Sequence, residues 1–171
     1  MITAFRRRGE QRRTGEAADR FARILRDTLN ELHKDNTAWE CGGPFKRGHE
    51  RVDVTGYNRR SRKPRVLLEV ELRRQTPLAN IVKVWKWIKN GELSRNVVVV
   101  QAFSKRYSGT DARKVNAELI GKLMQKAVGC RYIFAPLEYS PGKGTKRGGG
   151  ALRKRAKELA AQILDKLPKR T

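Results

Sequence analysis

Acidic residues are scarce in this chain of 171 residues: 17 Asp and Glu stand against 40 Lys and Arg, which leaves a formal net charge of +23 at pH 7. A charge of this size makes the folded chain repel itself, and neutralising phosphates is the usual compensation. The composition therefore predicts a nucleic-acid partner, bound with an affinity that falls steeply with salt.

Cysteine is also rare, and long apolar runs are missing. Cys41 and Cys130 have no second Cys or His at ligand spacing, so the sequence predicts neither a disulfide framework nor a zinc site, and both thiols are expected to be reduced core residues. No run of about 18 apolar residues exists, and the N-terminus lacks the apolar stretch of a signal peptide. We expect a soluble, cytoplasmic protein without a membrane partner.

Apolar residues make up 38% of the chain, which is enough to form a buried core. The length and patterning predict one α/β (α+β) domain over 15–140, with appendages. The expected order is a flexible basic arm (1–14), a helix from Thr14 or Gly15 to about His33, a short or bent strand within 39–45, a hairpin of strands 51–57 and 66–72, a helix (76–89), a strand (96–103), a helix (111–127) and a strand (132–137).

The C-terminal part of the chain is predicted to be an appendage. A Gly-rich basic linker is expected over 141–150, followed by an amphipathic helix over 151–171. The apolar stripe of this helix must dock on the body or on another subunit, so a homodimer or a partner subunit is a possible use of it.

Two glutamates interrupt an otherwise apolar strand. Alternation places Glu69 and Glu71 on one face of the 66–72 strand, and antiparallel pairing across the turn can bring Asp53 close to Glu69. Adjacent carboxylates repel one another, and their burial is costly without compensation. Convergence of the three carboxylates would suit Mg²⁺ or Mn²⁺, which can activate water for attack on a phosphate.

Asp53, the turn and Glu69-Val70-Glu71, with a helix before them and a helix and strand after them, resemble the PD-(D/E)XK nuclease superfamily. The resemblance covers roughly residues 15 to 135. It implies a restriction-endonuclease-like αβββαβ core, with a mixed central sheet flanked by helices, and Mg²⁺-dependent (or Mn²⁺-dependent) cleavage of duplex or branched DNA. Asp53 matches the first metal-binding Asp of this superfamily, and Glu69 matches its second acidic ligand.

The chain departs from the superfamily's pattern at two positions. Val52 replaces a Pro, and Glu71 occupies the place of the catalytic Lys. Some restriction enzymes of the superfamily carry Glu-x-Glu, and in other members the Lys lies on the following helix. Asn80, Lys83 and Trp87 form a stripe along one flank of the predicted 76–89 helix, so Lys83 is the candidate for the displaced Lys.

The superfamily often adds a glutamate from its first helix. Glu31 shares the side of the first helix that is expected to face the sheet, and Glu40 and Glu50 are its rivals. The predicted catalytic set is Asp53, Glu69, Glu71, Lys83 and Glu31, with Asp53, Glu69 and Glu71 as metal ligands. The residues predicted to contact nucleic acid are Arg59, Arg60, Arg62, Lys63, Asn80, Lys105, Arg106, Lys143, Lys146, Arg147, Arg153 and Lys154.

Several alternatives stay open at this stage. Glu69 and Glu71 could be solvated residues of an edge strand, paired with Arg65, Arg73 or Arg74, and Lys83 could merely extend from an amphipathic helix. Trp85 and Trp87 are expected to be packing residues, although Trp87 could be exposed. Single histidines without a catalytic partner, His33 and His49, are not expected to be ligands. The principal hypothesis is a metal-dependent DNA endonuclease. The alternative is a non-catalytic basic nucleic-acid-binding protein, either a decayed nuclease fold or a ribosome-associated factor.

Overall fold

The computed structural model describes the backbone of residues 2–44, 50–72, 76–107, 109–139 and 149–168, and their side chains from residue 16 onward. Its elements follow the chain in the order α1 (Ile2–Leu32), β1 (Thr37–Cys41), β2 (Val54–Asn58), β3 (Pro64–Glu71), α2 (Pro77–Lys89), β4 (Val98–Ser104), α3 (Ala112–Val128), β5 (Arg131–Leu137) and α4 (Gly149–Lys166). The order of helices and strands expected from the sequence is confirmed from the first helix to the last, and the chain is of the α/β (α+β) class.

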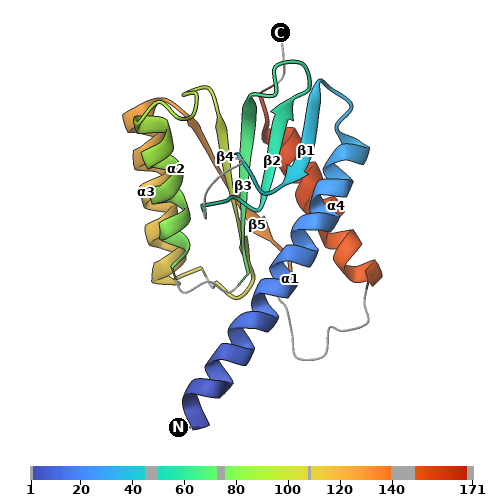
Figure 1. Cartoon of the computed structure of the whole chain (residues 1–171), viewed down its shortest axis with the longest axis vertical. Coiled ribbons are helices and arrows are strands. Elements are labelled where there is room, and N and C mark those ends of the chain that lie inside the picture. The colour runs from blue at the N-terminus through green and yellow to red at the C-terminus, as the bar shows by residue number, and fades with distance from the viewer. Residues whose placement is uncertain (1, 45–49, 73–75, 108, 140–148, 169–171) are drawn as a thin grey trace.

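The five strands form one mixed sheet in the order β1-β2-β3-β4-β5 (Figure 1). The β1, β2 and β3 strands pair antiparallel, and β3, β4 and β5 pair parallel. Helices α1 and α4 cover one face of the sheet, and α2 and α3 cover the other (Figure 1). Glu69 lies opposite Gln101 of β4 in the parallel register, so the two acidic positions of β3 lie in the middle of the sheet.

The alternation of side chains along the strands produces a separate core on each face. The core under α1 and α4 contains Phe21, Leu25, Leu68, Val70 and Leu159, all of which are buried. The core under α2 and α3 contains Leu67, Ile81, Val84, Val99 and Met124. Because Glu69 and Glu71 alternate with Leu68 and Val70, they point into the layer beneath α2 and α3.

Local sequence signals explain where the helices on the second face begin and end. Pro77 occupies the first turn of α2, where its missing N–H group costs no hydrogen bond. The side chain of Asp111 accepts a hydrogen bond from the backbone N–H of Arg113 at the start of α3, and Gly129 ends α3 with a left-handed φ of 75°. These signals account for the start of α2 and for both ends of α3.

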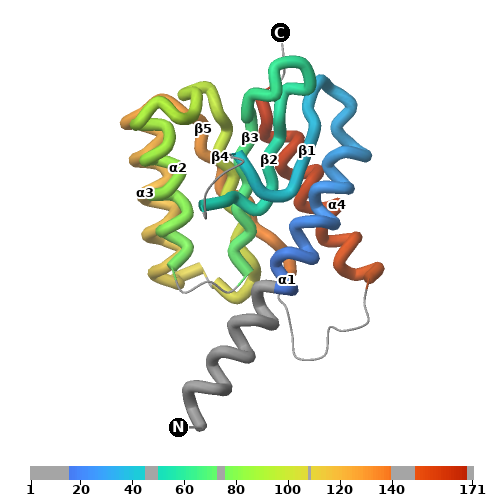
Figure 2. The backbone as a smooth tube through the Cα atoms, viewed as in Figure 1, coloured from blue at the N-terminus to red at the C-terminus, as the bar shows by residue number. Residues whose placement is uncertain are grey.

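One prediction about the N-terminal region is wrong. Helix α1 begins at Ile2, within the segment 1–14 that was expected to be a flexible basic arm, and its part from residue 16 onward lies beside α4 (Figure 2). Cys41 shares a strand face with the buried Trp39, but it is the last residue of β1 and is exposed, contrary to the prediction, whereas Cys130 is buried as predicted.

The apolar stripe of the last helix packs on the body of the same chain. Residues along α4 are buried at Leu152, Ala156, Leu159, Ala160 and Ile163, and α4 contacts α1 and β5. Most of the predicted 141–150 linker lies outside the described residues. Among the helices that the structure describes, none has the length and apolar content required to cross a membrane.

Candidate active site

Glu69 and Glu71 are buried in the centre of the sheet. Their side chains are 1% and 0% exposed, and the strand that carries them, β3, lies between β2 and β4. The alternative that they are solvated residues of an edge strand is therefore wrong. A buried carboxylate is costly unless it is paired and hydrogen-bonded, so the contacts of these two groups determine what the site can do.

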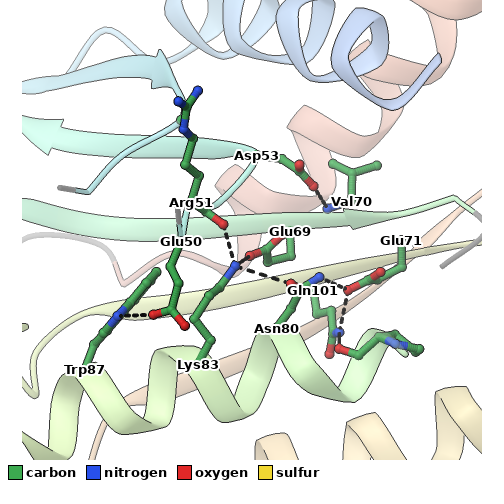
Figure 3. A network of polar contacts seen from close by, with 12 residues as sticks. Glu50, Arg51, Asp53, Glu69, Val70, Glu71, Asn80, Lys83, Trp87 and Gln101 are labelled. Atoms are coloured by element: carbon green, nitrogen blue, oxygen red, sulfur yellow. Dashed lines mark hydrogen bonds and ion pairs between the residues drawn. The ribbon is translucent and has the colours of Figure 1, made fainter. Parts of the chain in front are cut away.

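Lys83 forms an ion pair with Glu69, which agrees with its predicted position on one flank of α2. The Nζ atom of Lys83 lies 2.8 Å from Oε1 of Glu69 and 3.3 Å from Oδ1 of Asn80, and it also donates to the backbone carbonyl of Arg51 (Figure 3). The Lys83 side chain is 12% exposed whereas that of Glu69 is 1% exposed. Lys83 thus lies between solvent and the buried carboxylate, and its burial strengthens the ion pair.

Glu71 is held by two amide side chains. Its Oε1 atom accepts hydrogen bonds from Nδ2 of Asn80, at 2.8 Å, and from Nε2 of Gln101, at 2.9 Å (Figure 3). The same Gln101 nitrogen donates to the carbonyl of Pro77 at 3.0 Å, and its Oε1 accepts from the hydroxyl of Tyr132 at 3.0 Å. A continuous chain of hydrogen bonds therefore runs from β5 through β4 and β3 to α2.

Asp53 lies beside the next residue of the same strand. Its Oδ2 atom accepts a hydrogen bond of 2.7 Å from the backbone N–H of Val70, and its own N–H donates to the carbonyl of Leu68 at 3.1 Å (Figure 3). The predicted antiparallel pairing therefore brings Asp53 close to Glu69. The two carboxylates interact electrostatically, and the negative charge of Asp53 raises the pKa of Glu69.

The protonation of Glu69 reflects this environment. The pKa of Glu69 is raised from 4.5 to about 8: burial is the largest cause, the negative charge of Asp53 acts in the same direction, and the charge and hydrogen bond of Lys83 oppose both. The Oε2 atom of Glu69 is buried and has no hydrogen-bond partner among the described residues. Such a raised pKa in a carboxyl with a specific charged neighbour is typical of functional sites, although structural ion pairs also produce it.

The three predicted metal ligands do not converge on one point. No group of three or more His, Cys, Asp and Glu residues within the described ranges is arranged to hold a metal ion. The oxygen of Glu71 that contacts Asn80 and Gln101 is already used twice. A pair formed by Asp53 and Glu69 is what the geometry offers, and Mg²⁺ is commonly bound through one or two carboxylates with water completing its shell.

Glu31 does not join this cluster. It is exposed, and α1 covers the opposite face of the sheet, so the expectation that Glu31 faces the sheet beside the other acidic residues is wrong. Of its two rivals, Glu40 pairs with Arg62 at 2.7 Å. Glu50 accepts a hydrogen bond of 3.2 Å from Nε1 of Trp87 and lies beside Lys83 (Figure 3). Glu50 is therefore the acidic residue of that segment nearest to the cluster.

Trp87 is a packing residue, as predicted, but it is not exposed. Its side chain is 2% exposed, and Nζ of Lys83 lies 5.5 Å from the centre of its ring. His33 contacts Asp35 at 3.3 Å and accepts a hydrogen bond from Nε1 of Trp39 on the other face of the sheet. His49 lies outside the described residues.

The predicted nucleic-acid contacts divide into several groups. Arg59, Arg60, Arg62 and Lys63 are exposed in the turn between β2 and β3, and Arg153 and Lys154 are exposed on α4. Lys105 and Arg106 are exposed after β4, where Lys105 pairs with Glu138. Asn80 is 4% exposed and belongs to the buried cluster, so its expected surface role is wrong. Lys143, Lys146 and Arg147 lie outside the described residues.

Sequence reasoning missed Gln101 and Tyr132. Gln101 is the only polar side chain in the run from Val97 to Phe103, and its side chain is fully buried. A polar residue at that place in an apolar strand is a signal that could have been used, because buried polar groups require a partner. Tyr132 carries no comparable signal, since tyrosine is common in strands.

Comparison with known proteins returned no significant match: no protein-family model matches the chain, and neither does any curated protein or solved structure.

Proposed function

We propose that this protein is a metal-dependent endonuclease that hydrolyses phosphodiester bonds in DNA, duplex or branched. The observation that carries the proposal is the buried Glu69 carboxylate, which lies close to Asp53, is paired with Lys83 and has one oxygen without a hydrogen-bond partner among the described residues. A core built only for stability gains nothing from such a group, because an apolar side chain there would avoid its desolvation cost. Its position on an αβββαβ scaffold agrees with the resemblance to the PD-(D/E)XK superfamily.

A divalent cation fits the residues that are present. Asp53 and Glu69 would hold Mg²⁺ or Mn²⁺, since carboxylate oxygens are the ligands that these ions prefer. The Oε2 atom of Glu69 would gain a partner and Glu69 would be favoured in its ionised form. When bound, such an ion supplies an activated water and stabilises negative charge on the phosphate.

The remaining residues of the cluster have distinct parts in this proposal. Lys83 would hold a phosphate oxygen or orient the attacking water, because its ammonium group lies 2.8 Å from Glu69 on the solvent side of the carboxylate. Glu71 would position Asn80 rather than bind metal, and Asn80 in turn accepts a hydrogen bond from Lys83 at 3.3 Å. Gln101 and Tyr132 would hold Glu71 in place from the neighbouring strands.

The test is cleavage of supercoiled, linear and branched DNA by the purified protein in Mg²⁺, Mn²⁺ or EDTA. The variants Asp53→Asn and Glu69→Gln keep the size of each side chain, and Glu31→Gln is the matched control on an exposed residue. We expect metal-dependent cleavage in the wild type and in Glu31→Gln, and its loss in the other two variants. Cleavage that persists in Glu69→Gln would contradict the proposed site.

A non-catalytic nucleic-acid-binding protein is the second candidate. It is favoured by the contacts that already compensate the burial of the two carboxyl groups: Lys83 pairs with Glu69, and Asn80 and Gln101 donate hydrogen bonds to Glu71. With a net charge of +23, such a protein would still bind DNA strongly at low salt. Equal DNA binding by the wild type and both site variants, without cleavage in any metal, would select this candidate.

A further inference from the structure

The turn between β2 and β3 concentrates positive charge at one point of the surface. The hexapeptide 58–63 reads Asn-Arg-Arg-Ser-Arg-Lys and contains no acidic residue. Residues 59–63 are all exposed. Exposed basic turns are common on soluble proteins, so the charge alone assigns no role. The geometry of the turn adds a second observation.

Four backbone N–H groups of this turn are fixed by hydrogen bonds. The side-chain oxygen of Asn58 accepts from the N–H groups of Arg60, at 2.9 Å, and Ser61, at 3.0 Å. The N–H of Asn58 donates to the carbonyl of Lys63 at 3.0 Å, and the N–H of Arg62 donates to the carbonyl of Asn58 at 2.9 Å. An asparagine that binds the backbone in this way stabilises a turn from within.

The turn is also attached to the rest of the protein. The N–H of Arg59 donates to the carbonyl of Asn36, which precedes β1, at 2.9 Å. Arg62 has a left-handed φ of 55°, a conformation that residues other than glycine rarely adopt. Its guanidinium group lies 4.9 Å from the centre of the Tyr57 ring and 2.7 Å from Oε1 of Glu40. Arg62 thus connects the turn to β1 and β2.

These contacts divide the four cations into two kinds. The charge of Arg62 is directed toward Glu40 and Tyr57, whereas Arg59, Arg60 and Lys63 are exposed on a turn whose backbone is fixed. A binding surface that is already ordered loses less conformational freedom when its ligand binds. Cations held at fixed spacing suit a ligand whose own charges are regularly spaced, as the phosphates of a duplex are.

We propose that the β2–β3 turn is a preformed phosphate-binding surface for duplex DNA, in which Arg59, Arg60 and Lys63 contact phosphates and Arg62 holds the turn in shape. This inference rests on the proposed function for its choice of DNA. A single strand is disfavoured as the ligand because Tyr57 is 8% exposed and covered by Arg62, so it offers no stacking surface for a base.

The distance to the candidate active site suits one duplex. Glu69 lies six positions after Lys63, which immediately precedes β3, and a strand rises about 3.3 Å per residue, which gives about 20 Å. Base pairs rise about 3.4 Å, so this distance corresponds to about six base pairs. A duplex bound at the turn can therefore pass the cluster within the same helical turn.

The test measures binding of a fluorescent DNA duplex in EDTA, where cleavage cannot occur, over a series of KCl concentrations. Each phosphate contact contributes about 0.9 to the slope of log K against log salt. Removal of the three exposed cations, by Arg59→Ala, Arg60→Ala and Lys63→Ala together, should reduce that slope by about 2 to 3. The matched control, Lys89→Ala, Lys122→Ala and Lys126→Ala together, removes the same charge from α2 and α3 and should change it by less than about 1.

A second variant tests whether Arg62 acts by holding the turn in shape or only through its positive charge. Glu40→Gln removes the ion-pair partner of Arg62 and makes the protein one unit more positive. If only net charge mattered, this variant would bind duplex DNA more tightly. If Arg62 holds the turn in shape, the affinity for duplex DNA should fall about threefold or more, because the preformed surface is lost.

The outcomes distinguish this proposal from the nuclease proposal. Equal slopes for the two triple variants, or tighter binding by Glu40→Gln, would overturn the phosphate-binding turn even if the protein cuts DNA. A larger loss of slope on a single strand than on the duplex would also overturn it. A specific loss of slope on the duplex, with no cleavage in any metal, would support the turn and reject the nuclease.

Discussion

The two faces of the sheet use the same strand differently. Beneath α1 and α4, β3 presents Val66, Leu68 and Val70 to an apolar core. Beneath α2 and α3, the alternating positions present Leu67, Glu69 and Glu71, and the last two lie in a network of ion pairs and hydrogen bonds. A face that serves only stability can be apolar throughout. Buried carboxylates on the other face carry a desolvation cost that stability does not require.

The largest expected effect lies on the apolar face. Leu68→Ala removes a fully buried side chain and should lower the free energy of unfolding by about 2 to 5 kcal/mol, through lost apolar burial and the cavity that remains. Urea denaturation measures this change. The control is Leu119→Ala, because Leu119 is 54% exposed and its loss should cost less than about 0.5 kcal/mol. Similar costs for both variants would mean that the two positions are not packed as described.

The next effect lies on the polar face and concerns activity. Lys83→Met keeps much of the length of the side chain but removes the charge that faces Glu69, so the cleavage rate should fall about 100-fold or more while DNA binding changes little. Lys86→Met, on an exposed position of the same helix, is the control and should cleave within a few-fold of the wild type. Single-turnover kinetics at saturating protein separate the rate from binding. Equal cleavage rates in the two variants would show that Lys83 has no part in cleavage.

The pH dependence of stability offers a sharper comparison between the faces. Because the pKa of Glu69 is raised from 4.5 to about 8 on folding, the folded state retains a proton that the unfolded state has lost. The free energy of unfolding should therefore fall as the pH rises from about 4.5 to about 8, by at most about 1.4 kcal/mol per pH unit from this group.

Glu69→Gln has no such proton to lose and should flatten this dependence. Urea denaturation at several pH values measures it, and Glu31→Gln, an exposed glutamate on the other face, should keep the wild-type dependence. Parallel curves for the wild type and Glu69→Gln would show that Glu69 has the same affinity for protons in both states.

The smallest effect belongs to the end of the hydrogen-bond chain. Tyr132→Phe removes the hydroxyl that donates to Gln101 at 3.0 Å, which should lower the free energy of unfolding by about 0.5 to 1.5 kcal/mol. Cleavage should slow less than about tenfold, since the chain positions Lys83 only through Gln101, Glu71 and Asn80. Tyr139→Phe is the control, because Tyr139 stacks on Phe21 in the core of the apolar face. A larger loss of cleavage in Tyr139→Phe would contradict the positioning role.

Much of the architecture could be read from local patterns. The hairpin, the apolar β4 strand and the helix that begins near Pro77 follow from side-chain periodicity and turn residues, and the pairing of Asp53 with the Glu69 region follows from the hairpin itself. The stripe of Asn80, Lys83 and Trp87 on α2 also follows from the helical period, and this stripe does face the buried carboxylates.

Other features could not be read in this way. Val115, Leu119 and Leu123 are apolar residues at helical spacing on α3, yet they are 48%, 54% and 43% exposed. The sheet side of α3 instead carries Ala117, Gly121 and Met124. At Gly121 a Cβ atom would lie 2.3 Å from the Tyr132 ring. A residue without a side chain is therefore required on α3 where the large Tyr132 ring packs against it.

The sequence by itself determined which residues share a strand face or a helix face, because the periods of 2 and 3.6 residues are local properties of the backbone. It thereby placed Glu69 with Glu71, and Lys83 with Asn80. Only the tertiary structure decided which faces meet: that α2 lies over Glu69, that Gln101 and Tyr132 complete the hydrogen-bond chain, and that Glu31 lies on the far side of the sheet. These contacts depend on strand order and helix packing. Both bring together residues that are far apart in the chain, and neither produces a periodic pattern in the sequence.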